Sequence, residues 1–130
     1  MSSVTALDIT DETLVVAAPQ RVRDVLCDEA FWQQRMPGVR LRRIEDRGLL
    51  GKRWAVDGAM RGSAEVWLER WADGVVVHVF WQVDPADGRR LDARGRRRFG
   101  LEVKAHVTAV KDSLEEGRAP GTPRVEAVGE

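Results

Sequence analysis

The chain has 130 residues, of which 43% are hydrophobic, and its 21 basic and 21 acidic residues balance to a formal net charge of zero. This length predicts one domain with a core of ordinary size, and the charge balance argues against a general binder of nucleic acids. The single cysteine, Cys27, excludes an internal disulfide, and no apolar run is long enough to cross a membrane, so we expect a cytoplasmic protein without stable membrane insertion.

The first part of the chain predicts a strand and two short helices. Residues 1–8 carry no periodic signal and are expected to form a flexible end, whereas β-branched residues predict a strand over residues 9–18. Pro19 starts the first helix, because its missing N–H costs nothing in a first turn. The second helix covers Glu29 to Arg35, with Asp28 as its N-cap.

Four extended segments follow, separated by turn residues. They are residues 39–45, 51–57, 63–71 and 75–84. Alternation of apolar and other side chains in three successive segments is typical of an antiparallel meander with one buried face. Asp73-Gly74 predicts a two-residue hairpin turn between the last two segments.

The last predicted element is a long amphipathic helix from about Asp92 to Glu116, ended by Gly117 and the prolines after it, with residues 119–130 as a second flexible end. Its apolar residues recur at steps of three or four and so form one stripe: Phe99, Val103, Val107, Val110 and Leu114. The order of elements indicates an α+β fold, in which a curved antiparallel sheet of about five to six strands carries two short helices and the long helix on its concave face.

Five stretches, taken in order, carry a family resemblance. They are Val15–Pro19, Val22–Asp28, the Met36–Val39 sequence that closes the second helix, the mid-sheet segment 58–69, and Leu114–Arg118 at the end of the long helix. Together they resemble the Bet v 1-like, helix-grip superfamily, in particular its bacterial polyketide cyclase/dehydrase-like (SRPBCC) branch, which is related to START lipid-transfer domains. The resemblance covers about residues 9–123.

The resemblance implies a single helix-grip domain over residues 1–130, with a hydrophobic pocket between the sheet and the long helix and no cofactor. The chain departs from the family where Arg23 stands at a position that often carries Trp. It also has fewer strands than the six or seven usual in the family. The pocket is therefore expected to be shallower or more open than in larger members.

The expected ligand-binding residues are apolar side chains that face the space between the sheet and the long helix. They are Trp32, Met36, Trp54, Val56, Met60, Val66, Leu68, Val77, Val79, Trp81, Phe99, Val103 and Val107. The alternative is that they fill a close-packed core. In this fold class the region of Trp32 and Met36 forms part of the pocket mouth, although Trp32 could instead only attach its short helix to the sheet.

No catalytic or metal-binding set is predicted. By alternation His78 lies on the outer face of the sheet, and it and His106 fit surface or hydrogen-bonded histidines better than catalytic ones. Outer-face carboxylates could pair with arginines across strands, which fits a solvated sheet face better than a catalytic pair of carboxylates. The carboxylates are Asp57, Glu65 and Glu69, and the arginines are Arg53, Arg61 and Arg70.

Two surface features remain. An arginine cluster precedes and begins the long helix, namely Arg89, Arg90, Arg94, Arg96, Arg97 and Arg98. It could meet a phosphate, an acidic ligand head or a nucleic acid backbone, although a solvated basic face is the default and nucleic acid is disfavoured. Trp67 and Trp71 on the outer face predict a homodimer interface; the alternative is a reversed strand phase that places both rings inside.

The sequence therefore favours a protein that binds a small hydrophobic or amphipathic molecule. The second hypothesis is a polyketide cyclase or dehydratase, and the third is a protein-interaction module with a vestigial cavity. Catalysis requires a polar pair inside the cavity. No such pair can be assigned, and the chain has no tyrosine.

Overall fold

The computed structural model describes residues 6–125. Its elements, in chain order, are β1 (Leu7–Val15), α1 (Pro19–Leu26), α2 (Glu29–Arg35), β2 (Val39–Asp46), a 3₁₀ turn η1 (Gly48–Leu50), β3 (Gly51–Gly58), β4 (Met60–Trp71), β5 (Gly74–Pro85) and α3 (Ala93–Leu114). The strands form one antiparallel sheet of five in the order β1-β5-β4-β3-β2. The predicted α+β helix-grip architecture is confirmed.

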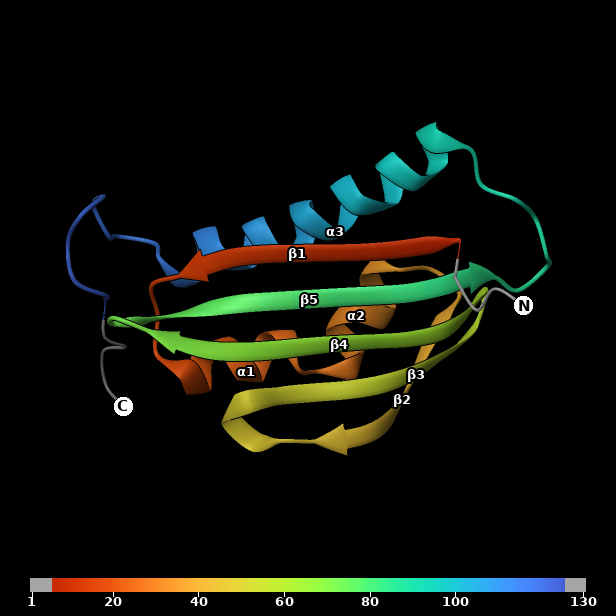
Figure 1. The fold of residues 1–130 in the computed structure, drawn as a ribbon. Helices are drawn as coiled ribbons and strands as arrows, with labels where there is room; N and C mark the ends of the chain where they lie inside the picture. Colours follow the sequence, from red (N-terminus) through yellow and green to blue (C-terminus); the bar gives the residue numbers. More distant parts are fainter. Residues whose placement is uncertain (1–5, 126–130) are drawn as a thin grey trace.

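The helices share one face of the sheet. Figure 1 shows α1 and α2 behind the strands, while α3 runs along β1. The opposite face is uncovered by any element among residues 6–125. No helix in this part of the chain combines the length and apolar character that crossing a membrane requires.

The phase of β4 and β5 follows the predicted alternation. Val66 and Leu68 are 1% exposed on the helix-covered face, whereas Trp67 and Trp71 are 38% and 62% exposed on the other face. On β5, Val77 and the other odd-numbered residues from Val75 to Val83 are buried with them. Because side chains alternate between the two faces of a strand, one strand register places all these apolar side chains on the same face, which is the face that the helices cover.

The long helix buries the whole predicted stripe, from Phe99 to Leu114. Asp92 is its N-cap, and the Asp92 Oδ1 accepts a hydrogen bond from the Gly95 N–H at 2.8 Å. The helix ends at Leu114, two residues before the predicted Glu116. Gly117 has a φ of +86°, in the left-handed region that favours glycine.

Two local predictions were wrong. The first strand begins at Leu7 and ends at Val15, because Leu7 is fully buried opposite Val83 and extends the alternation by one pair. The hairpin loop is not Asp73-Gly74, since Trp71 pairs with Gly74 and leaves Ala72 and Asp73 as the loop.

Gly74 is required for a different reason. A Cβ at this position would lie 2.5 Å from the Val15 carbonyl oxygen, so a side chain would push apart the end of β1 and the start of β5. Ala72 takes the positive φ of the turn, at +53°. The glycine therefore permits a close approach of two backbones, and the turn forms beside it.

Candidate ligand-binding site

An open hollow lies where the start of α3 stands over the end of the sheet. It has a volume of about 440 Å³ and adjoins a smaller hollow of about 120 Å³ through Met60, Phe99 and Glu102, which line both. We call the two hollows together the mouth. Leu7, Leu91, Arg89, Arg90, Asp92, Gly95 and Arg98 complete the larger hollow, and Met36, Pro37 and Val39 complete the smaller one.

Three turns form the sheet side of the mouth and are joined by backbone hydrogen bonds. The Ala59 N–H donates to the Gly38 carbonyl at 2.8 Å, and the Ala86 N–H donates to the Ala59 carbonyl at 2.9 Å. A Cβ on Gly58 would lie 2.2 Å from the Gly38 oxygen, so glycine allows the β3–β4 turn to approach the α2–β2 turn. This contact holds Met60, the first residue of β4, at the mouth.

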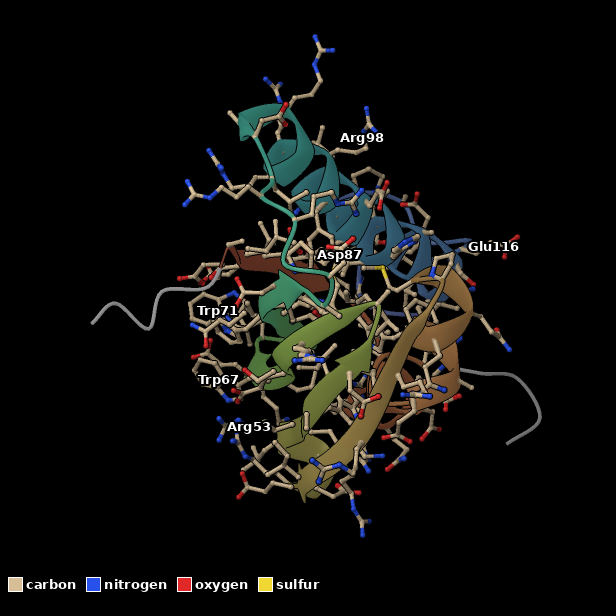
Figure 2. The ribbon with its side chains drawn as sticks, turned by 90° about the vertical axis from the view of Figure 1, so that its right-hand side faces the viewer. Arg53, Trp67, Trp71, Asp87, Arg98 and Glu116 are labelled. Atoms are coloured by element: carbon tan, nitrogen blue, oxygen red, sulfur yellow. The ribbon has the colours of Figure 1, made fainter. Side chains whose placement is uncertain are left out.

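The rest of the loop between β5 and α3, from Asp87 to Asp92, forms the opposite rim. It is held by the Asp92 cap and by Arg96, whose Nη1 donates to the Leu91 carbonyl at 2.7 Å. Figure 2 views the molecule from this end, with Asp87 on the loop and Arg98 above it on α3. The short loop brings Leu91 and Phe99 to the same hollow.

The mouth contains three of the predicted ligand-binding residues: Met36, Met60 and Phe99. The others belong to the packed core between sheet and helices, and each is at most 4% exposed. They are Trp32, Trp54, Val56, Val66, Leu68, Val77, Val79, Trp81, Val103 and Val107. Their role in binding stays a prediction.

A chain of aromatic rings leads from the mouth into this core. The ring of Phe99 meets Trp81 edge-on at a centroid distance of 5.8 Å, and Trp81 meets Trp32 in the same way at 5.7 Å. Trp32 Nε1 donates to the Leu26 carbonyl at 2.8 Å, which attaches α2 to α1. Edge-on packing is a favourable arrangement of aromatic rings.

The indole nitrogen of Trp81 differs from those of the other buried tryptophans. Trp54 Nε1 donates to Glu29 Oε2 at 2.6 Å, and Trp32 has the Leu26 carbonyl. Among the described residues, Trp81 Nε1 is the one buried side-chain nitrogen or oxygen without a hydrogen-bond partner. Buried polar groups almost always have a partner. The Trp81 N–H can therefore still donate a hydrogen bond to a ligand or a water.

The ionisable groups near α1 and α2 are structural. Burial opposes ionisation of Glu29, but hydrogen bonds from Lys52 and Trp54 outweigh it and lower the pKa of this carboxyl. Lys52 Nζ lies 2.6 Å from Glu29 Oε2, which ties α2 to β3. Burial raises the pKa of the Cys27 thiol to about 11, so this thiol is protonated at neutral pH and is a poor nucleophile.

Neither histidine lies at the mouth. His78 is on the outer face, as predicted; its Nε2 is 3.0 Å from Glu69 Oε1, its Nδ1 is 3.3 Å from Glu12 Oε1, and its ring stacks on Trp67 at 4.3 Å. His106 is on α3, where burial and the nearby Arg35 guanidinium lower its pKa. Within residues 6–125 no group of three or more His, Cys, Asp or Glu side chains is placed to hold a metal ion.

Asp57 pairs with an arginine on the neighbouring strand, but none of the three outer-face carboxylates has one of the arginine partners named from the sequence. Glu65 accepts from Arg47 at 2.7 Å, Asp57 accepts from Arg40 at 2.8 Å, and Glu69 contacts His78 instead of an arginine. The bulge in the β2–β3 pairing between Arg43 and Glu45 shifts the register there. The partner of Glu65 comes from the turn after β2, which strand pairing does not predict.

Sequence reasoning missed several residues of the mouth. Leu7 was assigned to a flexible end, although its spacing of two from Ile9 extends the strand pattern and was a usable signal. The arginine cluster was treated as a solvated face, because nothing in the sequence shows that Arg89, Arg90 and Arg98 meet the same hollow as Phe99. Glu102 also lines the mouth, one helical turn after Arg98.

The comparisons identify the fold. No protein-family model and no curated protein matches this chain, but solved structures do. The Aha1 dimer from Colwellia psychrerythraea has a TM-score of 0.66 at 12% identity and covers 87% of this chain and 99% of its own. ChR145 from Cytophaga hutchinsonii has 0.60 at 10%, covering 84% and 94%, and Ara h 8.0201 has 0.52 at 9%, covering 82% and 95%.

These similarities place the chain among proteins with the Bet v 1-like helix-grip fold. At identities of 9–12% they establish the architecture. The features of this particular chain are its open mouth, the unpartnered Trp81 nitrogen and the arginines beside Phe99.

Proposed function

We propose that this protein binds a small hydrophobic or amphipathic molecule at the mouth, as a member of the polyketide cyclase/dehydrase-like branch of the fold. The observation that carries the proposal is the apolar floor made by Met60 and Phe99 where the two hollows join. A volume of about 440 Å³ lies in the range of small-molecule sites, which span roughly 300–1,000 Å³.

The Trp81 nitrogen supports the same proposal. Trp81 packs against Phe99, and Phe99 lines the mouth, so we propose that a ligand which displaces the Phe99 ring reaches the indole N–H with an oxygen. A carbonyl or hydroxyl would satisfy the donor. Trp81→Phe removes the N–H and keeps an aromatic ring, so we expect the fold to persist while a ligand with a carbonyl loses affinity by about tenfold.

Native mass spectrometry of freshly purified protein tests the proposal directly. We expect a co-purified small molecule, or a thermal shift on adding lipids or aromatic polyketides. Met60→Trp should fill the mouth and remove binding. Ala109→Trp is the matched control, because Ala109 lies at a separate hollow beside Val110 and Leu114.

A clean apo mass together with no thermal shift from any of these compounds would refute ligand binding. Loss of binding in both tryptophan variants would also count against the mouth as the site, because Ala109 and Met60 line two different hollows.

The geometry supports binding over catalysis. Among the residues that line the mouth, the carboxylates are Asp92, which caps α3, and Glu102. A cyclase or dehydratase requires an acid–base pair within reach of the substrate. His78 and His106 lie elsewhere in the fold, so we do not assign a catalytic role to either.

The outer face supports a second proposal, a homodimer. Leu14, Trp67 and Trp71 are 40%, 38% and 62% exposed, and Figure 2 shows both tryptophans on the side of the sheet opposite the helices. The Aha1 protein from Colwellia psychrerythraea is described as a dimer. Exposed aromatic clusters are typical of protein–protein contacts.

Light scattering after size exclusion tests the dimer. We expect a dimer for the natural chain and a monomer for Trp67→Glu. Leu101→Glu is the control, since Leu101 is 58% exposed but lies on α3. A natural chain that stays monomeric at high micromolar concentration would end this proposal and leave the first one intact.

A further inference from the structure

Some arginines of this chain pair with a carboxylate: Arg23 with Asp46 at 2.9 Å, Arg40 with Asp57 at 2.8 Å, and Arg47 with Glu65 at 2.7 Å. Others on the sheet, such as Arg70, are exposed and have no carboxylate partner among the described residues. The arginines around the start of α3 differ from both sets in lying beside an apolar hollow. Arg90 and Arg98 make no hydrogen bond or ion pair with any described residue, and both line the larger hollow.

Carboxylates near these arginines are largely committed to the backbone. Asp92 Oδ1 accepts from the Gly95 N–H at 2.8 Å and caps α3. Asp87 Oδ1 accepts from the Arg89 N–H at 2.9 Å, and its Oδ2 lies 3.8 Å from Arg89 Nε, a long ion pair. Glu102 stands at the helix side of the hollow. The lining therefore presents three guanidinium groups against two carboxylates.

The helix itself adds to this positive field. The N-terminal end of α3 carries the positive end of the helix dipole, and Arg94, Arg96 and Arg97 extend from the same turn region. Positive side chains near the positive end of the helix dipole, and near one another, are unfavourable in the protein without a ligand. An anion placed among them would relieve that repulsion, so the cluster is better suited to a bound state than to a stable empty surface.

The apolar floor adjoins these arginines directly. Leu7, Met60 and Phe99 line the same hollow as Arg90 and Arg98, and Figure 2 shows Arg98 on α3 at the mouth end of the molecule. An anion alone would not use the apolar floor, and an uncharged hydrocarbon would not use the arginines. A molecule that carries both groups matches the whole lining.

We propose that the ligand of the mouth is a single-chain amphiphile with an anionic head group, a carboxylate or a phosphate. This inference rests on the proposed ligand-binding function and specifies its chemistry. The head group pairs with Arg90 and Arg98, whose planar forks suit carboxylate and phosphate oxygens. The tail covers Met60 and Phe99.

Isothermal titration with three probes of equal chain length tests the inference: dodecanoate, dodecyl phosphate and dodecanol, each below its aggregation concentration. We expect the two anions to bind about tenfold more tightly than the alcohol. Charge-assisted hydrogen bonds from an arginine to an anion in a partly desolvated site increase affinity by a factor of that order. The preference should fall as salt is raised. Comparing dodecanoate with dodecyl phosphate identifies the head group.

Variants assign the effect to the mouth. Arg90→Gln combined with Arg98→Gln should reduce both anions to the affinity of dodecanol, and Arg98→Lys should retain part of the preference. Arg42→Gln combined with Arg70→Gln is the matched control, because Arg42 on β2 and Arg70 on β4 are exposed and this pair of substitutions removes the same charge. These arginines are exposed, so the variants should fold.

The outcomes separate this inference from the proposed function. Equal binding of all three probes, unchanged in the arginine variant, would overturn the anionic head group and leave ligand binding standing. Binding of none of them, with no co-purified molecule, would overturn both. The anionic-ligand inference would also be overturned if the protein sediments with anionic phospholipid vesicles but does not bind free dodecanoate, since the arginines would then bind a membrane surface.

Discussion

The two halves of α3 contrast in how they are attached to the rest of the protein. The C-terminal half, from Val103 onward, places its apolar stripe in the core, and Val103 and Val107 are fully buried. Polar side chains add a second set of contacts to β1. Lys104 Nζ donates to Thr13 Oγ1 at 2.9 Å, and Lys111 Nζ donates to the Leu14 carbonyl at 2.8 Å.

The N-terminal half has few such contacts. Phe99 is its one buried residue among positions 93–102, and Leu101 is 58% exposed. Figure 1 shows this end of α3 rising away from β1, beyond the sheet. The helix contains Gly95 and Gly100 here, and glycine in a helix interior weakens it by about 1 kcal/mol.

The difference teaches that one continuous helix can hold a core at one end and border a binding site at the other. Binding regions are commonly drawn from the less stable parts of a structure, because a ligand needs access. We expect the half of α3 that packs in the core to fix the axis of the helix, and the half with fewer contacts to adjust around a ligand. Variants in each half can break or sharpen this contrast.

The largest expected effect compares two aspartate substitutions on the same helix. Val107→Asp places an unpaired charge in the core and should lower the free energy of unfolding by about 4 kcal/mol or more. Leu101→Asp should change it by about 0.5 kcal/mol or less, because this side chain is in water. Urea unfolding followed by circular dichroism measures both, and similar losses would remove the contrast.

A smaller effect involves the carboxylate at the end of the stable half. Burial opposes ionisation of Glu115, but hydrogen bonds from Lys111 and the Val16 N–H outweigh it and lower the pKa of this carboxyl. These donors lie 2.7 and 2.8 Å from Glu115 Oε2. Glu115→Gln should therefore cost about 1–2 kcal/mol at pH 7.

The pH dependence of this loss has a definite sign. Because the pKa of Glu115 is lower in the folded protein, the stability it contributes is present above its ordinary pKa of 4.5 and declines as the pH falls below that value. The natural chain and Glu115→Gln should converge in acid. Glu102→Gln is the control in the other half, with little expected effect on stability; a constant gap for Glu115→Gln down to low pH would contradict the assignment.

The smallest expected effect is a gain. A Cβ on Gly100 would lie 3.6 Å from Ile9 Cδ1, an ordinary contact, so Gly100→Ala should stabilise the protein by about 0.5–1 kcal/mol. Gly95→Ala should gain less, because its Cβ would lie 3.3 Å from Asp92 Oδ1 and Leu91 Cδ2. Thermal unfolding measures both, and a loss for Gly100→Ala would show that the weak half is under steric strain.

The spacing of apolar residues predicted most of the fold, because the face that a helix or strand buries is set by residues close together in the sequence. The stripe from Phe99 to Leu114 and the alternation on β4 and β5 each bury one side of an element, and both were confirmed. The hairpin at Asp73-Gly74 was misplaced by one residue, because Gly74 is needed for its approach to Val15 and not for the turn. That contact joins positions far apart in sequence.

The candidate site was predicted less completely for the same reason. Met60 and Phe99 were expected to bind ligand and do lie at the mouth. Leu7, Leu91 and the arginines reach it from three separate segments, and their grouping depends on where the β5–α3 loop crosses the end of the sheet. The orphan nitrogen of Trp81 depends on every neighbour of that ring, so no sequence pattern could predict it.

The sequence by itself determined the order of the main elements, the face that the later strands and the final helix bury, and the approximate extent of that helix, because side-chain spacing sets these locally. The tertiary structure decided that the two halves of α3 differ. The stripe runs through both halves, but Val103, Val107, Val110 and Leu114 enter the core, whereas Phe99 borders the hollow that Leu7 and Met60 also line. Whether a stripe residue enters a core or borders an opening depends on what lies opposite it, and distant segments supply that surface.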